Sequence, residues 1–433
     1  MSKRIVVLGG GYVGLYTSLG LLRKLRAGEA TVTVIDPRSY MTYQPFLPEA
    51  SAGSLSPRHV VVPLRRVLKG AEIINAHVTK VDHARKVVTV EPLEGPSYEV
   101  PYDEVVVALG SKARTLPIPG LAEQGIGFKT VEEAIWLRNH VLRCLDLAAS
   151  TQDAERRSRA LTFTFVGGGY AGVEAIAELE DMARYALRYY PQLHPDELRF
   201  VLVEATGRIL PEVGEDMGRY TLDELRQRGL DVLLETRLES CVDGHVVLSD
   251  GQRFDSDTVV WTAGVKASPV LANTDLPLDD KGRLVCDADL RVHGLADAWG
   301  AGDNAAVPDI TNPGSFCSPS AQHAVRQATH LADNIVKSLR GKEIEPYRHK
   351  HVGSVASLGL HKGVAQVYGV KLRGWPAWFM HRTYHVSRVP TLNRKIRVIV
   401  DWTLALFFKR EIVSLGEMAA PREEFHQAAG GGQ

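Results

Sequence analysis

Two glycine-rich turns in this 433-residue chain have the composition of pyrophosphate-binding turns. The first reads VLGGGYVGL from Val7, and the second reads FVGGGYAGVE from Phe165. Glycine lets the backbone approach a pyrophosphate, and the helix that follows offers it free N–H groups and a positive dipole end. When the two stretches are aligned, the glycines coincide at Gly9, Gly11 and Gly14 and at Gly167, Gly169 and Gly172.

An acidic residue follows each turn at the end of the next predicted strand. The strand ATVTVID ends at Asp36, and the strand LRFVLVE ends at Glu204. A carboxylate in this place can accept hydrogen bonds from an adenosine ribose. One such pattern also occurs in ordinary strand–turn–helix units, but two complete copies predict two dinucleotide sites. Glu204 would also disfavour the 2′-phosphate of NADPH, although Arg208 could weaken that repulsion.

The two copies differ most clearly where Tyr16 of the first becomes Glu174 of the second. Glu174 falls in the first two turns of the second predicted helix, where a carboxylate beside a cofactor could exchange a proton near neutral pH. The alternative is an acid that only complements the helix dipole. Glu178 and Glu180, further along, are expected to be ordinary helix-surface or packing residues.

A third segment distinguishes the two ligands. LADAWGAGDNAA contains Gly302 and Asp303 and precedes the predicted helix SAQHAVRQATHLADNIV. Flavoproteins with two dinucleotide sites pair such a segment with a glycine turn to hold FAD, and Asp303 would then reach the ribityl and phosphate region. The alternative is that Asp303 caps a helix. The predicted strand VVVALGSKA, from Val105, fits the same site, so we predict FAD at the first turn and NAD at the second.

Two such turns require two Rossmann-like α/β domains to position them. We predict an FAD domain formed by residues 1–115 and 285–345, with an NAD domain of residues 120–280 inserted into it. Residues 346–433 form a predicted C-terminal helical module that associates with a membrane. The length of the chain is sufficient for a large core in each part.

The chain resembles the two-dinucleotide flavoproteins and, among them, the type II NADH dehydrogenases, which are single-subunit NADH:quinone oxidoreductases. The stretches VVWTAGVKASP, from Val259, and AQHAVRQ, from Ala321, are the most specific to this family. The other stretches that carry the resemblance are GGGYVGL at Gly9, YQPFLPEASAG at Tyr43, GGGYAGVEAIAELE at Gly167 and GAGDNA at Gly300. The resemblance implies hydride transfer from NADH to non-covalent FAD and electron transfer to a membrane quinone, without proton pumping.

The resemblance also implies particular site residues. For FAD they are Gly9, Gly11, Tyr12, Val13, Gly14, Asp36, Val78, Ala108, Gly110, Gly302, Asp303, Ala321 and Gln322. For NAD they are Gly167, Gly169, Tyr170, Ala171, Gly172, Glu204, Ala263 and Gly264. The catalytic residues are Glu174, at the nicotinamide and in proton delivery toward the quinone, and Gln322, near the isoalloxazine ring.

One departure from the family pattern concerns the predicted helix that begins near Ala321. The family reads Ala-Gln-x-Ala-x-Gln here, whereas this chain has Arg326 at the second glutamine position and Gln327 one place later. The departure leaves the flavin assignment unchanged, because Ala321 and Gln322 match. Whether this helix contacts the quinone, as it does in the family, is not decided by the sequence.

The positions of the cysteines exclude several classes of electron acceptor. The stretch after Asp36 contains no cysteine, and the chain has no C-x-x-C motif, which excludes the redox-active pairs of the glutathione-reductase and thioredoxin-reductase types. A sulfide:quinone oxidoreductase needs cysteines beside the flavin, and only Cys317 is near a predicted flavin segment. We expect reduced, structural thiols and no metal site. The four cysteines are Cys144, Cys241, Cys286 and Cys317.

The C-terminal region is basic and aromatic. Residues 371–410 contain nine Lys and Arg side chains and a single acid, Asp401. This composition, with an apolar helical face formed by Ile396, Ile399, Val400, Leu404, Phe407 and Phe408, is typical of a segment that binds an anionic membrane surface. GWPAWFMHRTYHV is a second amphipathic candidate. The alternative is a packed helix that closes a domain and has a solvated basic flank.

Bulk properties narrow the class of function. Lys plus Arg and Asp plus Glu both total 51, so no global charge attracts nucleic acid. No apolar run approaches the roughly 18–20 residues of a membrane span, and we see no signal peptide. We therefore expect a peripheral respiratory-chain enzyme at the cytoplasmic face of the cell membrane, with the membrane quinone and the anionic membrane surface as partners. A homodimer is left open.

Two alternatives keep the same cofactors. In the first, an NAD(P)H-dependent flavoprotein reduces a soluble carrier such as a ferredoxin, and the basic C-terminal face binds that acidic protein. In the second, a redox-responsive protein binds flavin and nicotinamide in a stable complex and turns over slowly with every acceptor.

Overall fold

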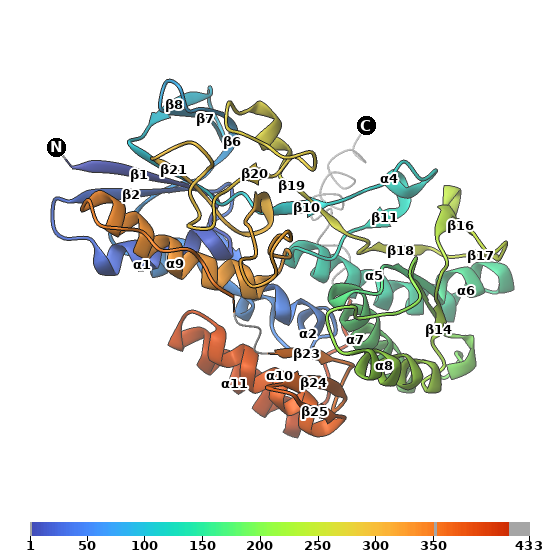
Figure 1. Cartoon of the computed structure of the whole chain (residues 1–433). Helices are drawn as coiled ribbons and strands as arrows, with labels where there is room; N and C mark the ends of the chain where they lie inside the picture. Colours follow the sequence, from blue (N-terminus) through green and yellow to red (C-terminus); the bar gives the residue numbers. More distant parts are fainter. Residues whose placement is uncertain (1, 350–352, 415–433) are drawn as a thin grey trace, which may run out of the picture. The chain divides into compact units, whose positions relative to one another are not determined.

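The computed structural model describes residues 2–349 and 353–414 (Figure 1). The chain divides into two compact units, each with its own parallel sheet. Unit 1 consists of Met1–Thr42, Val61–Arg114 and Val265–His351, and unit 2 consists of Tyr43–Val60, Thr115–Gly264 and Val352–Gln433. The α/β class is confirmed, and the described part of the predicted C-terminal module belongs to unit 2 from residue 353 onward. Residues 350–352 and 415–433 of that module lie outside the described residues, and the three-part division stays a prediction.

Unit 1 is built on a five-stranded parallel sheet with the strand order β21-β9-β1-β2-β5. The strands at its centre are short runs of Val, Ile and Leu that are almost completely buried, as is typical of parallel sheets. Their bounds are β1 Lys3–Leu8, β2 Ala30–Ile35, β5 Glu72–Ile74, β9 Glu104–Val107 and β21 Ala298–Gly300.

Two long helices of unit 1, α1 (Tyr12–Lys24) and α9 (Ala321–Leu339), pack along each other (Figure 1). Gly20 allows this close approach, because a Cβ there would lie 2.5 Å from the Cβ of Ala332. Thr17 Oγ1 donates a hydrogen bond of 3.3 Å to the carbonyl of Ala328 across the same contact. The contact holds the two helices in register, and each begins beside a predicted FAD segment.

Smaller elements complete unit 1. An antiparallel meander contains β6 (Ala76–Asp82), β7 (Val87–Pro92) and β8 (Tyr98–Pro101). The remaining elements are the pairs β3 Tyr40–Thr42 with β4 Val61–Pro63, β10 Ser111–Ala113 with β19 Val265–Ala267, β20 Leu284–Val285 with β22 Ala305–Ala306, and the short helix α3 Leu64–Val67.

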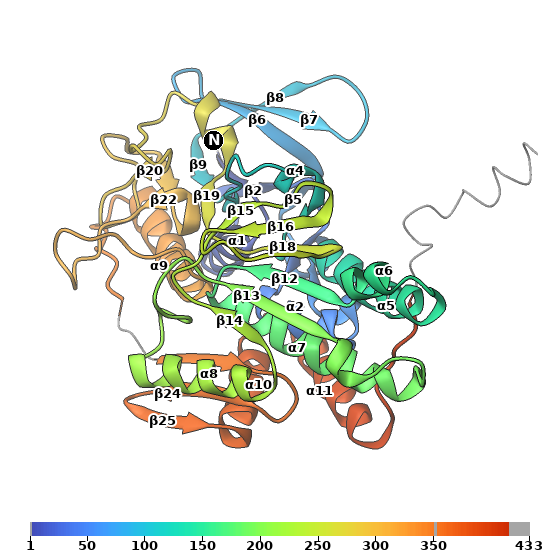
Figure 2. The same ribbon diagram turned by 90° about the vertical axis from the view of Figure 1, so that its right-hand side faces the viewer.

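Unit 2 repeats the design with a second five-stranded parallel sheet in the order β11-β18-β12-β13-β14. Figure 2 shows β12, β13 and β14 side by side, with α7 against them. The strands are β11 Gly125–Ile126, β12 Thr162–Val166, β13 Arg199–Val203, β14 Asp231–Leu233 and β18 Thr258–Trp261. The helices are α2 Leu47–Ser51, α4 Leu121–Gln124, α5 Val131–Ser150, α6 Ala154–Ala160, α7 Tyr170–Ala186 and α8 Glu215–Gln227.

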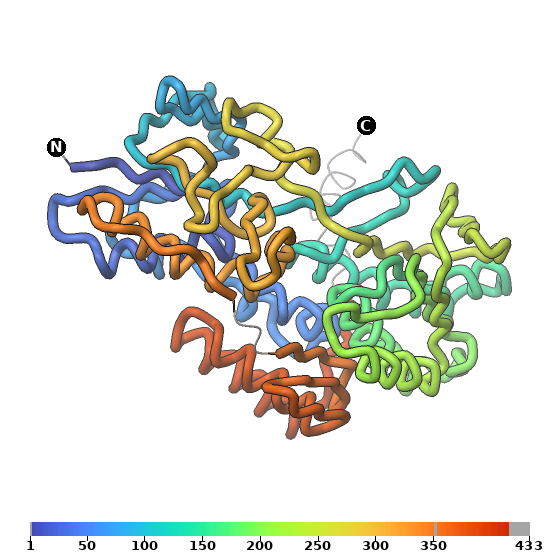
Figure 3. Tube along the Cα trace, in the orientation of Figure 1, coloured from blue at the N-terminus to red at the C-terminus, as the bar shows by residue number. Residues whose placement is uncertain are grey.

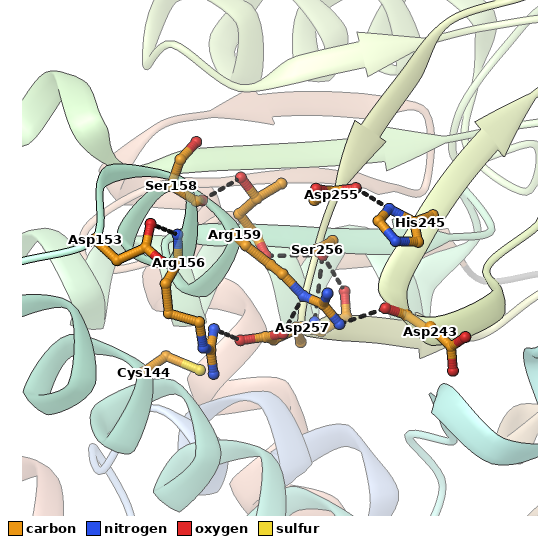
Figure 4. Close-up of polar contacts among 12 residues, drawn as sticks. Cys144, Asp153, Arg156, Ser158, Arg159, Asp243, His245, Asp255, Ser256 and Asp257 are labelled. Carbon is orange, nitrogen blue, oxygen red and sulfur yellow. Dashed lines mark hydrogen bonds and ion pairs between the residues drawn. The ribbon is translucent and has the colours of Figure 1, made fainter. Parts of the chain in front are cut away.

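A polar network ties α6 to the residues just before β18 (Figure 4). Asp257, just before β18, accepts hydrogen bonds from both Arg156 and Arg159 of α6. Ser256 Oγ donates to the carbonyl of Thr162 at the start of β12. The network therefore joins α6 to the starts of two interior strands, β18 and β12. Just before β18 the chain forms the meander β15 Leu238–Ser240, β16 His245–Leu248 and β17 Arg253–Asp255.

The C-terminal part of unit 2 is one continuous region of the trace, drawn in dark orange and red (Figure 3). It begins with an antiparallel sheet of β23 (Gly353–Ser357), β24 (Gly363–Val367) and β25 (Val370–Arg373). Both predicted amphipathic segments are helices, α10 (Trp375–Arg388) and α11 (Leu392–Phe407). Within the described ranges, no helix is sufficiently long and apolar to cross a bilayer.

Candidate functional site

The first glycine turn, between β1 and α1, has the geometry of a pyrophosphate cradle. Gly9 has a φ of +104°, and a Cβ there would lie 2.4 Å from the carbonyl oxygen of Ala108 at the end of β9. A Cβ on Gly14 would lie 1.7 Å from the carbonyl oxygen of Gly9. These two glycines are therefore required by the fold. Gly11 is different, because a Cβ there would meet no protein atom within 4 Å.

The second turn, between β12 and α7, has the same geometry. Gly167 has a φ of +114°, and Gly172 would bring a Cβ within 1.9 Å of the carbonyl oxygen of Gly167. Gly169, like Gly11, faces space free of protein atoms within 4 Å. Gly11 and Gly169 are the N-caps of α1 and α7, and no side chain caps either helix. Both helix N-termini are thus left open to an anion.

The acid after each turn is tethered in the same way in both units. Asp36 Oδ2 accepts a hydrogen bond of 2.7 Å from the backbone N–H of Gly10. Glu204 Oε2 accepts one of 2.6 Å from the backbone N–H of Gly168. The middle glycine of each turn therefore holds the carboxylate beside the cradle, where an adenosine ribose would lie. Burial raises the pKa of Asp36 above its ordinary value, against the hydrogen bond from Gly10.

The segment at Gly302 is anchored to β9 and to α9 in unit 1. Ser111 Oγ donates a hydrogen bond of 2.6 Å to Asp303 Oδ2, and the neighbouring Asn304 bonds the backbone of Val107 and Gly110. The N-cap of α9 is Ser320, whose side chain accepts from the N–H of His323, so Asp303 does not cap that helix. This removes the helix-cap alternative.

The departure at Arg326 and Gln327 has a structural explanation. Gln327 Oε1 accepts a hydrogen bond of 2.7 Å from the backbone N–H of Gly302. Gln327 is buried and helps to shape the turn before Asp303. Arg326 NH1 contacts His349 Nδ1 at 2.9 Å instead. The displaced glutamine is therefore a support for the predicted FAD segment, a role that the sequence alone did not indicate.

The other predicted FAD residues all belong to unit 1. Tyr12 and Val13 are the first residues of α1, and a Cβ on Gly302 would lie 2.7 Å from Val13 Cγ2. Ala108 and Gly110 follow β9, and Gly110 donates to Asn304. Ala321 and Gln322 begin α9, and Val78 lies in β6. The open cradle, the tethered acid and the anchored second segment fit an FAD.

The predicted NAD residues lie at the corresponding end of the unit 2 sheet. Tyr170 and Ala171 begin α7, and burial raises the pKa of the Tyr170 hydroxyl. Ala263 and Gly264 follow β18, whose end packs on the turn: a Cβ on Gly167 would lie 2.8 Å from the backbone nitrogen of Ala263. Glu204 completes the group through its bond to Gly168.

Glu174 is 7% exposed and lies on the second turn of α7. The backbone N–H of Ser357, at the end of β23, donates a hydrogen bond of 2.8 Å to Glu174 Oε1. His381 Nε2, on α10, is 3.2 Å from the same oxygen. Ser357 and His381 were not predicted, because they lie 183 and 207 positions along the chain, at separations that no local pattern reveals.

Of the two roles expected for Glu178 and Glu180, helix surface or packing, the structure shows packing. Each is only 1% exposed. Ser357 Oγ donates a hydrogen bond of 2.8 Å to Glu178 Oε1, and Glu180 forms ion pairs with Arg184 and Arg228. Burial raises the pKa of Glu178 to about 7, helped by the nearby Glu49. The two acids are packing residues, and α7 buries a row of carboxylates.

The cysteines are all unpaired and buried, as expected for structural thiols. Burial raises the pKa of Cys144 to about 12 and that of Cys317 to about 11. A thiol with such a pKa is protonated at neutral pH and is a poor nucleophile. The structure therefore gives no support to electron transfer through a cysteine pair.

Arg382, counted among the basic side chains of the C-terminal region, is a core residue of unit 2. Its NH2 group donates a hydrogen bond of 2.8 Å to Glu49 Oε2, and its guanidinium lies 4.0 Å from the ring centroid of Trp378 and 4.7 Å from that of Trp402. Beside it lies a pocket of about 860 Å³ walled by parts of α2, α7 and α11. Glu174 is not among the residues that line this pocket.

Comparison with known proteins agrees with this geometry. Residues 2–328 match the family described as pyridine nucleotide-disulphide oxidoreductase. A type II NADH:quinone oxidoreductase from Staphylococcus haemolyticus is 31% identical over 89% of this chain and 95% of the relative. A probable NADH dehydrogenase from Dictyostelium discoideum is 29% identical over 95% and 91% of the two chains. The structure of NDH2 from Plasmodium falciparum in complex with NADH superposes with a TM-score of 0.88, at 18% identity, over 95% of this chain and 100% of the other.

The chain therefore belongs to the pyridine nucleotide-disulphide oxidoreductases and, within them, to the type II NADH:quinone oxidoreductase family. It is an enzyme of the flavoprotein class that uses FAD and NADH, as the resemblance in sequence implied.

Proposed function

We propose that this chain oxidises NADH with bound FAD and passes two electrons to a membrane quinone, without pumping protons. The observation that carries the proposal is the pair of matched glycine turns, each with an acid tethered to its middle glycine, in a chain of this family. The family relatives named for quinone reduction support quinone as the acceptor. The buried, protonated cysteines support an acceptor that needs no thiol.

FAD, when bound, accepts a hydride from a nicotinamide and releases two electrons to the acceptor. The residues of unit 1 hold it. The open N-terminus of α1 at Gly11 would bind the pyrophosphate, and Asp36 would bind the adenosine ribose. Asp303, held by Ser111, would bind the ribityl region, and Gln322 in the first turn of α9 would contact the flavin ring system.

NADH is the preferred nicotinamide cofactor because Glu204, a carboxylate, is held in place by its bond to Gly168. Glu204 binds the ribose 2′-hydroxyl of NADH and repels the 2′-phosphate of NADPH. Arg208 has its NH2 group bonded to the carbonyls of Pro211 (3.0 Å) and Val213 (2.7 Å), and no bond to Glu204 is formed among the described residues. The guanidinium is directed into its own loop.

Glu174 has two functions in this proposal: it positions the nicotinamide and it delivers a proton toward the quinone. Its position in the first two turns of the helix that binds the NADH pyrophosphate supports the first function. Its burial beside His381 supports the second, since a buried carboxylate next to an imidazole can exchange a proton with it.

Attachment to the cytoplasmic face of the cell membrane is proposed to occur through α10 and α11. The apolar face predicted for α11 is exposed, with Ile399 48% and Phe407 78% accessible, and Trp375 and Phe379 of α10 are also exposed. Single exposed apolar residues are ordinary, but a continuous set beside Lys and Arg is typical of a membrane-binding surface. Each basic residue near an anionic surface adds about 1 kcal/mol at low salt. The homodimer stays a prediction.

The activity is tested in two steps. Under anaerobic conditions, NADH should bleach the flavin absorbance, and a short-chain quinone added next should restore it within the turnover time. Co-sedimentation with anionic vesicles then separates a quinone reductase from a reductase of a soluble carrier. Rapid bleaching with no reoxidation by quinone, but full reoxidation by a ferredoxin, would overturn the proposal.

A further inference from the structure

Two histidines of α10 lie next to each other, and one of them lies next to Glu174. His381 and His385 are one helical turn apart, and their ring centroids are separated by 4.5 Å. His381 Nε2 lies 3.2 Å from Glu174 Oε1, and His385 Nδ1 lies 3.3 Å from the hydroxyl of Tyr43. Glu174, His381 and His385 therefore form a row of three groups, each of which can bind and release a proton.

His381 is the inner member of this row. It is 1% exposed, and among the described residues neither of its ring nitrogens makes a well-formed hydrogen bond. Burying polar nitrogens without hydrogen-bond partners costs free energy of folding. Such groups in a folded protein often have a catalytic role. The carboxylate of Glu174 is within reach of a small rotation of the ring, so the imidazole can form that bond when it carries a proton.

His385 is the outer member. It is partly exposed, whereas Tyr43 is buried. The Tyr43 hydroxyl also donates a hydrogen bond of 3.2 Å to the backbone carbonyl of His385, which fixes the position of the ring. Burial, and next the charge of His381, hold the pKa of His385 well below its ordinary value. The ring is thus neutral between transfers, and its exposed part lets solvent reach it.

The other charged groups around the row come from α2 and α7. Glu178 approaches through Ser357, which bonds both acids, and its carboxyl is protonated below about pH 7. Glu49 is neutralised by its pair with Arg382. Glu178 and Glu49 thus each have a partner of their own, and Glu174 is the carboxylate that faces His381.

The reaction requires one proton from solvent. NADH, one proton and a quinone yield NAD⁺ and a quinol, since the hydride supplies two electrons and one proton while the quinol retains two protons. We propose that His385 and His381 relay this solvent proton to Glu174. The inference rests on the proposed proton-delivering role of Glu174 and adds two positioning residues to it.

The test separates the two half-reactions in the flavin-loaded full chain. His381→Gln and His385→Gln preserve size and hydrogen bonding but do not carry a proton. We expect flavin reduction by NADH within twofold of the original protein and reoxidation by a short-chain quinone at least about tenfold slower, with its pH dependence flattened. Ferricyanide should be reduced at the original rate, because it accepts electrons without protons.

Two controls make the outcome decisive. His361→Gln alters an exposed histidine near Trp378 that does not contact the row, and it should leave both acceptors unaffected. Free imidazole should restore quinone reduction in His385→Ala, because that position is accessible, and should not restore it in His381→Ala. If one variant fails to bind flavin, the other carries the test.

The results also distinguish this inference from the proposed function. Original kinetics with quinone in both Gln variants would overturn the relay while leaving the quinone reductase intact. Equal slowing with quinone and ferricyanide would also overturn it, since that would reflect altered structure. Absence of quinone reduction in the unmodified protein would overturn the proposed function itself.

Discussion

Replacing the buried carboxyl of Glu178 by an amide, Glu178→Gln, should stabilise the protein above neutral pH. Glu178 is 1% exposed, and Ser357 Oγ is the donor bonded to it. Burial raises its pKa to about 7 from the model-peptide value of 4.5. The charged form is therefore disfavoured in the folded state, whereas Gln is neutral at every pH and retains an oxygen for Ser357.

The sign follows from proton linkage. Because the pKa of Glu178 is higher in the folded than in the unfolded state, the folded state binds more protons between pH 4.5 and 7. Stability contributed by this group is complete below pH 4.5 and is lost as pH rises to 7. A shift of roughly 2.5 units corresponds to about 3 kcal/mol, and above pH 7 the loss is constant. Glu178→Gln should avoid that loss.

The assay is the melting temperature of the flavin-loaded protein from pH 5 to pH 8.5. The difference between Glu178→Gln and the original protein should grow as pH rises to about 7 and then level off, at on the order of 5 °C. Glu180→Gln, on the same helix, should instead destabilise the protein at every pH by about 3 kcal/mol. The change leaves Arg184 and Arg228 without their carboxylate partner. A pH-independent difference for Glu178→Gln would refute the reasoning.

Three further outcomes are expected. Gly11→Val should abolish FAD binding, read from the ratio of flavin to protein absorbance, while the fold persists, since a Cβ there meets no protein atom; Gly14→Val should instead prevent folding. Glu204→Ala should narrow the ratio of kcat/KM for NADH over NADPH by at least about tenfold, and equal use of both by the original protein would contradict our reading of this residue. Ile399→Glu with Phe407→Glu should reduce sedimentation with anionic vesicles without changing ferricyanide reduction, whereas Leu93→Glu, at an equally exposed apolar site in unit 1, should bind vesicles normally.

Local patterns were sufficient where function depends on a few consecutive residues. The turns at Gly9 and Gly167 could be identified because the glycines, the following helix and the acid after the next strand all lie within about forty residues. The structure added that each acid bonds the middle glycine of its turn. The exposed apolar face of α11 was readable because helical periodicity is also local.

Side-chain roles inside α7 could not be read in this way. The sequence EAIAELE gives no sign that Glu178 and Glu180 are buried, because burial depends on β23 and on Arg228, which come from distant parts of the chain. The same holds for Arg382, which composition assigns to a basic surface and which packing places between Trp378 and Trp402.

The sequence by itself determined the class of protein, its two dinucleotide turns and the helices expected to meet a membrane, because each is encoded by residue types at fixed local spacing. Only the tertiary structure decided which groups surround Glu174. Ser357 and His381 reach that carboxylate from β23 and α10, and Gln327 supports Gly302 from α9. Such partnerships are set by how distant segments pack, and packing depends on the whole chain rather than on any short stretch of it.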